Sequence, residues 1–422
     1  MKKNIILIRS LAFLMLICLI LINTPSCSPG GKKVKAMSLM DGIKSSKVDG
    51  KDADNTFISS AADFSIELFK LAAKENKNSL ISPVSVLLAL SMTANGADGD
   101  TLSQMEKVLS GGMSIDDLNK YLYSYSNSLP SNKKSKLSIA NSIWFRNEEN
   151  RLKVEPSFLQ KNADYYNAAA YSSPFDNQTL KDINGWVSSN TDGMIDSILD
   201  DISDDAVMYL INAVVFDAEW ENIYKRTDIH DGTFTGLDGK KQSVEFMESD
   251  ESYYIDDGKA QGFLKHYSGG SYSFAALLPN QGVDINDYLS GMSGESFLRS
   301  VKDANKEQVH VSLPKFSYDY SIELNDALKA MGMTKAFGGD ADFSKMGSSS
   351  RGGLYIENVL HKTFISVDEK GTKAGAVTKV EMKASGAPLE IRTIRLDRPF
   401  IYAIIDNSTG IPVFIGKLMD IG

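Results

Sequence analysis

The segment from Glu369 to Lys383 most constrains the fold of this chain, because it is patterned as a β-strand yet leads into a sequence typical of an exposed loop. One register is uncharged, and its first four residues are small: Thr372, Ala374, Ala376, Thr378, Val380 and Met382. The other register carries the charges: Lys373, Gly375, Val377, Lys379, Glu381 and Lys383. Successive side chains of a strand point to opposite faces. The segment can therefore insert between existing strands with one face buried and the other face exposed to solvent.

The residues that follow this segment are Ala384-Ser385-Gly386-Ala387-Pro388. They are small and flexible and end in proline, which is typical of an exposed loop that proteases can reach. An ordinary surface strand followed by a turn is the alternative. The pattern thus leaves two interpretations, a fixed surface strand or a cleavable loop that can become a strand.

The N-terminus carries an export signal. Three basic residues precede an apolar run over residues 11–22, which is too short and too early for a membrane-spanning helix. The run ends in Thr24-Pro25-Ser26-Cys27, which resembles a bacterial lipoprotein signal. We therefore predict that residues 1–26 are a signal peptide and that Cys27 is lipidated. A plain secretory signal cleaved nearby is the alternative.

Residues 27–55 are polar, rich in Ser, Lys, Asp and Gly, and show little hydrophobic periodicity. This composition predicts a flexible tether between the lipid anchor and a folded body. Residues 56–422 contain no clear linker, so we expect one large domain there. The chain is expected in the cell envelope of a Gram-negative bacterium. The lipid would hold it on the outer membrane, on the periplasmic or the surface face, and secretion is the alternative.

Composition excludes several classes of protein. The chain has 54 acidic and 45 basic side chains and a formal net charge of −9. This balance argues against a nucleic-acid binder, because phosphate contacts need clustered Lys and Arg. Both cysteines, Cys18 and Cys27, lie in the first 27 residues. The body therefore has no disulfide framework, no cysteine-ligated zinc site and no catalytic cysteine.

Catalytic motifs do not appear in the sequence. The four histidines form neither an HExxH motif nor another close metal pair, and there is no GxSxG nucleophile elbow or Gly-rich phosphate loop. A Ser-His-Asp triad stays open, because its members need not be adjacent in sequence. We predict that the chain is not an enzyme and uses no metal and no cofactor.

Helical patterns gather early in the body and strand patterns late. Helical spacing of apolar residues predicts helices over residues 57–74, 84–94, 101–109 and 322–330. Alternating or continuous apolar runs predict strands over residues 138–146, 207–217, 244–247, 261–267, 273–278, 308–316, 400–405 and 411–418. This order predicts an α+β fold and not a series of βαβ units.

A set of motifs along residues 57–422 resembles the serpin family. The motifs are Asn78 to Ser85 with Gly96 to Thr101, Asn212 to Phe216 with Trp220, Leu313 to Phe316, Leu328 to Phe337, Asp342 to Ser344, His361 to Thr372, and Asp397 to Lys417. The resemblance covers nearly the whole body. So many motifs in the same order are not expected by chance.

The resemblance implies a serpin fold, with three β-sheets, about nine helices and an exposed reactive-centre loop. It also implies inhibition of a serine protease, or of a cysteine protease, by a suicide mechanism. The protease cuts the loop and forms an acyl-enzyme, and the freed loop then inserts into the central sheet as a new strand. The implied partners are thus target proteases, joined covalently, together with the membrane through the lipid anchor. We expect a monomer.

Within this resemblance the patterned segment becomes the hinge of the loop. The hinge residues are Glu369, Gly371, Thr372, Ala374, Ala376 and Thr378. Bulk or charge on the inward face would slow insertion, and this face has neither. Lys373, Gly375 and Val377 depart from the pattern of the family, but they lie in the outward register. The hinge therefore favours an inhibitor. A non-inhibitory serpin that acts as an envelope binding module is the alternative.

Counting from the hinge glutamate, as in the family, places the scissile bond at Ser385–Gly386, with Ala384 as the second candidate. Small residues at this position suit the shallow apolar pocket of elastase-like or subtilisin-like proteases. Lys383 would instead present a site for a trypsin-like protease.

The resemblance also implies roles for residues of the sheet. The shutter, a polar cluster where the central sheet opens, is matched by Ser82, Ser85, Asn212 and His361. The breach, where the loop first enters, is matched by Trp220. Glu369 is expected to pair with Lys315 there and to hold the hinge shut until cleavage. Simple core packing is the alternative for each of these residues.

Overall fold

The computed structural model describes residues 34–132, 134–147, 152–204, 206–350, 352–372 and 392–421. Several predicted site residues lie outside these ranges: Cys27, Ala374, Ala376, Thr378, Lys383, Ala384, Ser385 and Gly386. The remaining predicted site residues can be placed in the fold.

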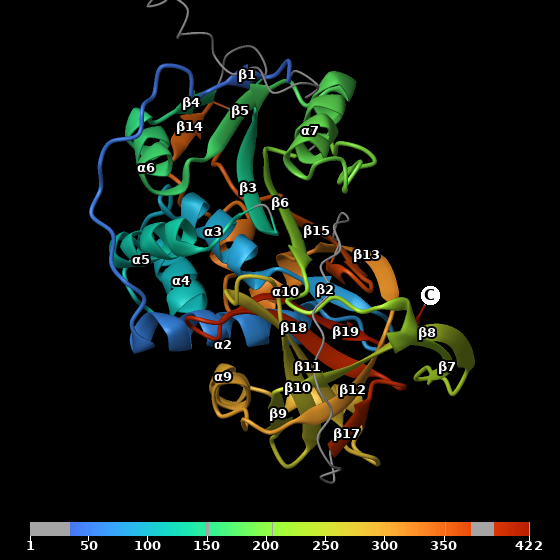
Figure 1. Cartoon of the computed structure of the whole chain (residues 1–422). Helices are drawn as coiled ribbons and strands as arrows, with labels where there is room; N and C mark the ends of the chain where they lie inside the picture. The colour runs from blue at the N-terminus through green and yellow to red at the C-terminus, as the bar shows by residue number, and fades with distance from the viewer. Residues whose placement is uncertain are drawn as a thin grey trace, which may run out of the picture. The chain divides into compact units, whose positions relative to one another are not determined.

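A seven-stranded sheet carries the predicted hinge. Its strands, in spatial order, are β1 (Met37–Ser38), β5 (Ala169–Ser173), β3 (Ser135–Arg146), β6 (Met208–Glu219), β16 (Gly371–Thr372), β15 (Asn358–Val367) and β13 (Phe316–Glu323). β3 and β6 are the long central pair and run antiparallel over eleven matched positions. Figure 1 shows β3, β5 and β6 in the upper part of the molecule.

β6 and β15 are joined differently at their two ends. From Asn358 to Lys362, β15 pairs directly with β6 in parallel. Beyond that ladder the two strands separate, and β16 lies between them. The seven-stranded sheet is thus already open at one end and closed in its middle.

Alternate residues of β3 and β6 enter different apolar clusters on the two faces of this sheet. Trp144 and Tyr209 belong to a small cluster with Ile183 and Trp186 of α7 (Asn177–Asn190). Their neighbours in sequence, including Ile143, belong to the large core. β6 is buried on both faces, which accounts for the nearly continuous apolar run in its sequence.

The described residues form two further large sheets and one small sheet. The six-stranded sheet comprises β2 (Ser79–Ile81), β19 (Pro412–Leu418), β18 (Phe400–Asp406), β11 (Tyr272–Pro279), β10 (Ala260–His266) and β9 (Tyr253–Asp256). The four-stranded sheet comprises β17 (Arg392–Arg395), β12 (Val309–Pro314), β8 (Lys241–Glu251) and β7 (Ile229–Thr235). A two-stranded sheet pairs β14 (Gly347–Ser349) with β4 (Leu152–Val154).

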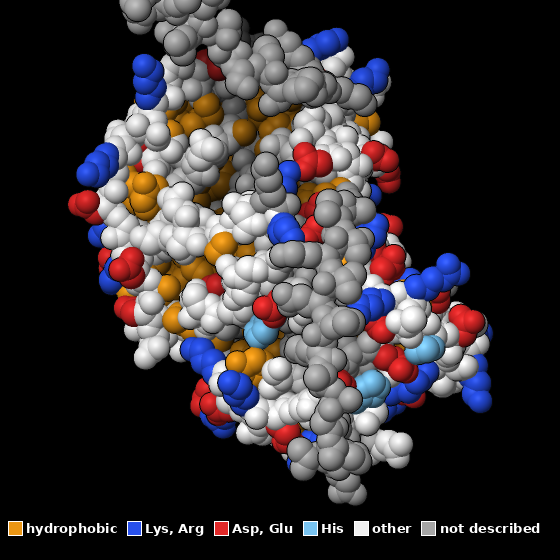
Figure 2. Space-filling model, viewed as in Figure 1, with side chains coloured by type: hydrophobic (Ala, Val, Ile, Leu, Met, Phe, Trp, Pro, Cys, Tyr) orange, Lys and Arg blue, Asp and Glu red, His pale blue; other side chains and the backbone are white. Residues whose placement is uncertain are grey.

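The outer face of the four-stranded sheet carries charges of both signs. His230 and His310 lie 3.8 and 3.9 Å from one oxygen of Glu248, and Arg395 lies 4.0 Å from the other oxygen. Figure 2 shows acidic, basic and histidine side chains mixed over β7 and β8. This face is therefore not a basic patch of the kind that binds nucleic acid.

Helices form the rest of the regular structure of the described residues. They are α2 (Asn55–Ala72), α3 (Pro83–Ala94), α4 (Gly99–Ser110), α5 (Ile115–Ser128), α6 (Pro156–Tyr166), α7, α8 (Ile285–Ser290), α9 (Gly294–Lys302) and α10 (Asn325–Ala330), with 3₁₀ turns η1 (Arg226–Asp228) and η2 (Lys335–Phe337). All residues of α3 are buried, because α3 packs against β3, β6 and β19. Pro83 lies in the first turn of α3. Proline suits this position because it has no backbone N–H, and the N–H groups of the first turn have no partner within the helix.

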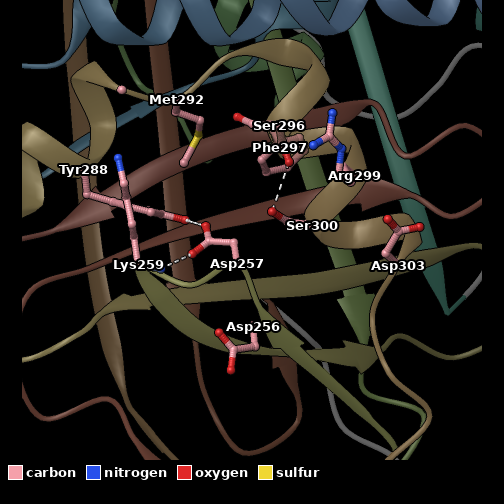
Figure 3. Close-up of a pocket in the computed structure, with 11 residues that line it drawn as sticks. Asp256, Asp257, Lys259, Tyr288, Met292, Ser296, Phe297, Arg299, Ser300 and Asp303 are labelled. Atoms are coloured by element: carbon pink, nitrogen blue, oxygen red, sulfur yellow. Dashed lines mark hydrogen bonds between the residues drawn. The ribbon is translucent and has the colours of Figure 1, made fainter.

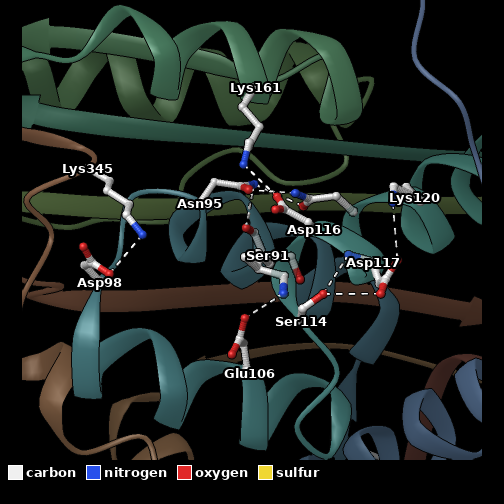
Figure 4. Close-up of polar contacts among 12 residues, drawn as sticks. Ser91, Asn95, Asp98, Glu106, Ser114, Asp116, Asp117, Lys120, Lys161 and Lys345 are labelled. Carbon is white, nitrogen blue, oxygen red and sulfur yellow. Dashed lines mark hydrogen bonds and ion pairs between the residues drawn. The ribbon is translucent and has the colours of Figure 1, made fainter.

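Polar contacts join the ends of α3, α4, α5 and α6 (Figure 4). The amides of Asn95 and Asn119 bond to each other, with distances of 2.7 and 3.2 Å. Lys161 of α6 lies 2.8 Å from Asp116 of α5. These contacts link α5 and α6 to each other and to the end of α3, which packs against β3 and β6.

The predicted helix over residues 322–330 is wrong in its first part. Residues up to Glu323 continue β13, and α10 begins at Asn325. Ile322 pairs with His361 in the ladder between β13 and β15. Tertiary pairing therefore overrides the helical spacing at this position.

Residues 34–54 do not form the flexible tether that the sequence predicts for residues 27–55. β1 pairs with β5, and a carboxylate oxygen of Asp182 accepts hydrogen bonds from the N–H groups of Lys35 (2.9 Å) and Ala36 (2.7 Å). Farther along, Lys51 donates its N–H to the carbonyl of Lys120. Main-chain groups make most of these bonds, so they leave no side-chain pattern to predict. In Figure 1 the segment descends past α6 and α5 to α2.

No helix among the described residues has the length and apolar character needed to cross a membrane.

Candidate functional site

The candidate site is the open end of the seven-stranded sheet, where the chain turns back between β6 and β15. β15 ends at Val367 and β16 begins at Gly371. The Asp368 carboxylate closes the turn by accepting hydrogen bonds from the N–H groups of Lys370 (2.8 Å) and Gly371 (3.2 Å). The N–H of Asp368 donates to the Gly371 carbonyl (3.0 Å). The turn therefore directs the chain that follows into the sheet.

Gly371 lies too close to β6 for any other residue to fit without movement. A β-carbon on Gly371 would lie 1.9 Å from the carbonyl oxygen of Ala218 and 2.9 Å from its carbonyl carbon. Glycine is the residue that allows such a close approach of two backbones. The close approach of β6 thus explains why glycine occupies this position of the hinge.

Thr372 is seated between the two strands and is 2% exposed. It pairs with Ala218 of β6 on one side and with Val367 of β15 on the other. Its Oγ1 lies 2.5 Å from the hydroxyl of Tyr267, whose ring stacks on Trp220 at 4.5 Å between centroids. Burial raises the pKa of Tyr267, so this phenol stays protonated. The first inward residue of the hinge is therefore already part of the sheet.

Trp220 and Tyr224 hold the turn from the continuation of β6. The backbone N–H of Trp220 donates to the carbonyl of Lys370 (2.8 Å), and its indole Nε1 donates to the carbonyl of Asp368 (2.9 Å). The backbone N–H of Tyr224 donates to the carbonyl of Glu369 (2.9 Å). All three carbonyls of the turn are thus bound by two aromatic residues.

The structure brings Glu369 and Lys315 together, as the sequence predicts. Lys315 Nζ lies 2.9 Å from a carboxylate oxygen of Glu369 and 2.9 Å from one of Glu245. The hydrogen bond from Lys315 lowers the pKa of Glu369. Burial acts to lower the pKa of Lys315, but the bonds to Glu369 and Glu245 outweigh it and leave that pKa raised. Both groups are therefore charged at neutral pH.

The predicted shutter residues meet where β6 and β15 pair directly. His361 Nε2 accepts a hydrogen bond from the N–H of Ser82 (3.0 Å), and His361 Nδ1 donates to Oδ1 of Asn212 (2.9 Å). The Asn212 amide nitrogen donates to the carbonyl of Ser85 (3.1 Å) and to Oδ1 of Asn141 on β3. This cluster ties β6 and β15 to each other and to the start of α3.

His361 is neutral in this cluster. Its side chain is fully buried, and burial lowers its pKa to about 3. The bond that it accepts from Ser82 requires an unprotonated Nε2, so neutrality and geometry agree. The hydroxyls of Ser82 and Ser85 are buried, with no hydrogen-bond partner among the described residues.

This arrangement divides the passage between β6 and β15 into two parts. At the open end, Gly371 and Thr372 already occupy it. In the middle, a parallel ladder of five residue pairs and the cluster at His361 close it. A longer strand can enter only if that ladder and that cluster separate.

The sequence misses three residues that complete the site. Tyr267 holds Thr372, Tyr224 holds the turn, and Asn141 extends the cluster at Asn212. No periodicity or motif in the sequence separates these residues from ordinary core positions.

Other features of the described residues do not form a competing site. A cavity of about 420 Å³ lies between the β9–β10 turn and helices α8 and α9 (Figure 3), where the hydroxyl of Tyr288 donates to Asp257 (2.5 Å). None of the predicted site residues lines it. The described part of the chain also has no group of three or more His, Cys, Asp or Glu side chains placed to hold a metal ion.

Comparisons with known proteins agree with this geometry. The family model "Serpin (serine protease inhibitor)" matches residues 59–421. An uncharacterized serpin-like protein of Thermococcus kodakarensis is 31% identical, and the match covers 85% of this chain and 84% of that protein.

Two solved structures of one thermophilic serpin, tengpin, are also similar to this chain. Its native state has a TM-score of 0.89 at 53% identity and covers 92% of this chain and 100% of that one. Its latent state has a TM-score of 0.79 at 52% identity and covers 88% of this chain and 100% of that one.

Proposed function

Because the chain belongs to the serpin family, whose members are generally protease inhibitors, we propose that it inhibits a serine protease as a suicide substrate. The observation that carries the proposal is the seated hinge. Gly371 and Thr372 pair with β6 on one side, and Thr372 pairs with β15 on the other. Insertion of the loop would extend this strand once the ladder between β6 and β15 and the cluster at His361 separate.

We propose that this conformation of the chain is the native state, in which the reactive-centre loop has not yet inserted into the sheet. The TM-score is higher with the native state of tengpin than with its latent state, although the identities are nearly equal. The direct ladder between β6 and β15 supports the same assignment, because an inserted strand would occupy that place.

The proposed reaction begins as ordinary proteolysis. The serine Oγ of the protease attacks the carbonyl carbon of the scissile peptide bond and forms an ester. The bond to the following nitrogen breaks, and that nitrogen leaves as an amine with a proton from the catalytic histidine of the protease. The freed loop then inserts between β6 and β15 before water hydrolyses the ester, so the protease stays attached.

We propose that the scissile bond is Ser385–Gly386, with Ala384 as the second candidate. Small residues at this bond suit elastase-like or subtilisin-like targets, and Lys383 would suit a trypsin-like target. The family's use of this loop supports the assignment, and the position rests on the count from Glu369.

The test is incubation of the purified chain with elastase, subtilisin and trypsin. A complex that resists SDS supports inhibition, and sequencing of the released C-terminal fragment locates the cleaved bond. Thr372→Arg places a charge in the buried inward position and is expected to convert the inhibitor into a substrate. Lys370→Arg, in the adjacent turn, is the matched control. Cleavage of the wild type without any complex and without a gain in thermal stability would refute the proposal.

We also propose that Cys27 carries a lipid and holds the protein on the cell envelope. The sequence motif at residues 24–27 supports this assignment. Expression in a bacterium fed with labelled palmitate tests it. Label in the wild type that is lost in Cys27→Ser would support the anchor, whereas an unlabelled wild type would contradict it.

A further inference from the structure

Lys265 on β10 is a buried charge next to the hinge, and the mechanism above does not use it. Its side chain is 2% exposed, and its Nζ lies 2.7 Å from a carboxylate oxygen of Glu251 on β8. Lysine is rarely buried to this extent, because removing a charge from water is costly. A buried lysine therefore needs an explanation in its surroundings.

The surroundings of Lys265 are two aromatic rings and one acid. Its Nζ lies 4.4 Å from the ring centroid of Tyr224 and 5.3 Å from that of Trp220. Ser249 links the acid to one ring, since its hydroxyl donates to Glu251 (2.7 Å) and lies 3.2 Å from the Tyr224 hydroxyl. A desolvated cation is attracted to the faces of such rings.

Lys265 is charged despite its burial. Desolvation acts to lower its pKa, but Tyr224 and Glu251 outweigh that effect and leave the pKa raised. The cation therefore persists across the physiological range.

The same two rings hold the turn of the hinge. Trp220 and Tyr224 provide the three hydrogen bonds to the carbonyls of residues 368–370, at 2.8 to 2.9 Å. Lys265 thus lies where three sheets meet. Lys265 itself is in the six-stranded sheet, and its partner Glu251 is in the four-stranded sheet. The rings of Trp220 and Tyr224 follow β6 of the seven-stranded sheet.

We propose that Lys265 is a positioning residue for loop insertion. Lys265 fixes Trp220 and Tyr224 against the hinge turn, and it thereby limits how often the open end of the sheet loosens. The inference rests on the proposed function for its biological meaning, because it concerns the same hinge. The measurable effect is local, since it is the opening of the three hydrogen bonds from Trp220 and Tyr224 to the carbonyls of residues 368–370.

The first experiment measures hydrogen exchange of the backbone amides of Trp220 and Tyr224 in the intact chain. In Lys265→Met we expect both amides to exchange about tenfold faster, which corresponds to about 1.4 kcal/mol of opening free energy. Lys417→Met is the matched control. Lys417 is also a buried lysine of the six-stranded sheet, 1% exposed, but it bonds to the carbonyl of Glu75 and to Asn286. The control is expected to leave both amides unchanged.

A second variant separates positioning from simple loss of stability. Lys265→Met leaves Glu251 without its cation, which by itself is destabilising. The double variant Lys265→Met with Glu251→Gln removes that unpaired charge. We expect it to recover thermal stability while the Trp220 and Tyr224 amides still exchange about tenfold faster than in the wild type.

The functional readout is spontaneous conversion of the uncleaved chain to a more heat-stable form, followed without any protease. We expect Lys265→Met to convert about tenfold faster than the wild type and Lys417→Met to convert at the wild-type rate. Wild-type exchange at both amides in Lys265→Met, or equal acceleration in Lys417→Met, would overturn the inference.

The failure of the inference and the failure of the proposed function give different results. If the wild type forms no complex with any protease while Lys265→Met still accelerates exchange, the inhibitor proposal fails and the positioning role stands. If the wild type forms complexes and exchange in Lys265→Met is unchanged, the positioning role fails alone.

Discussion

The shutter histidine gives the sharpest prediction, because its protonation is coupled to the closed state of the sheet. In the native state His361 is neutral, with a pKa of about 3, and in the unfolded chain its pKa is the ordinary 6.5. The unfolded chain therefore binds more protons below pH 6.5. Stability rises with pH wherever that holds. The contribution of His361 is thus fully present above pH 6.5 and is lost as the pH falls toward 3.

The magnitude follows from these two values. Between pH 7.5 and pH 5.5, protonation of His361 in the unfolded chain lowers the free energy of unfolding by about 1.4 kcal/mol. Protonation in the native state is negligible over this range, because its pKa lies well below pH 5.5. By pH 4.5 the loss from this one group reaches about 2.7 kcal/mol.

The assay is urea denaturation of the uncleaved wild type and of His361→Gln at both pH values. Glutamine has a similar length and no titratable group, and it can bond to both Ser82 and Asn212. All other titrating groups are shared, so they cancel in the difference between the two proteins. The wild type is expected to lose about 1.4 kcal/mol more than the variant. Equal losses in the two proteins would refute the account of a buried neutral histidine.

Three further changes test the hinge. Gly371→Ala places a β-carbon 1.9 Å from a carbonyl oxygen of β6, so we expect a loss of about 1 to 3 kcal/mol in urea denaturation and expulsion of the hinge from the sheet. Tyr267→Phe removes the bond to Thr372 and is expected to cost about 1 kcal/mol in the same measurement. Glu369→Gln removes the negative charge from the partly exposed pair with Lys315, so we expect a loss of at most about 1 kcal/mol that disappears in high salt.

The sequence signal of the hinge is local. The structure places Gly371 and Thr372 between β6 and β15, whereas the predicted hinge residues Ala374, Ala376 and Thr378 lie outside the described residues. Alternation of small uncharged residues from Thr372 depends only on which face of a strand is buried. The pairing of Glu369 with Lys315 and the meeting of Asn212 with His361 were predictable only through the family resemblance, since these residues are far apart in the chain. The structure supplies the distances that the resemblance could not.

The parts that the sequence misses depend on main-chain bonds or on buried polar groups. Residues 34–54 lie against the body through backbone pairing with β5 and through N–H groups that bond to Asp182, so their polar side chains look like a linker. Lys265 lies in a strand that mixes polar and apolar residues, and nothing in the spacing of β10 shows that two rings and an acid will surround it. Such groups are visible only when all their neighbours are placed.

The register of β16 indicates which hinge residue would reach the closed part of the sheet. Thr372 lies opposite Ala218 in an antiparallel pairing. If the strand grows in this register, each further residue moves one position back along β6, and Thr378, six residues on, comes opposite Asn212. That position lies inside the ladder closed by His361. In this register Ala374 and Ala376 would come opposite the apolar residues Phe216 and Val214 of β6, so we expect small apolar side chains to suit these two positions. Thr378 can bring a hydroxyl to Asn212 at the point where the histidine cluster must separate, so a small polar residue suits the shutter where a small apolar residue suits the approach to it.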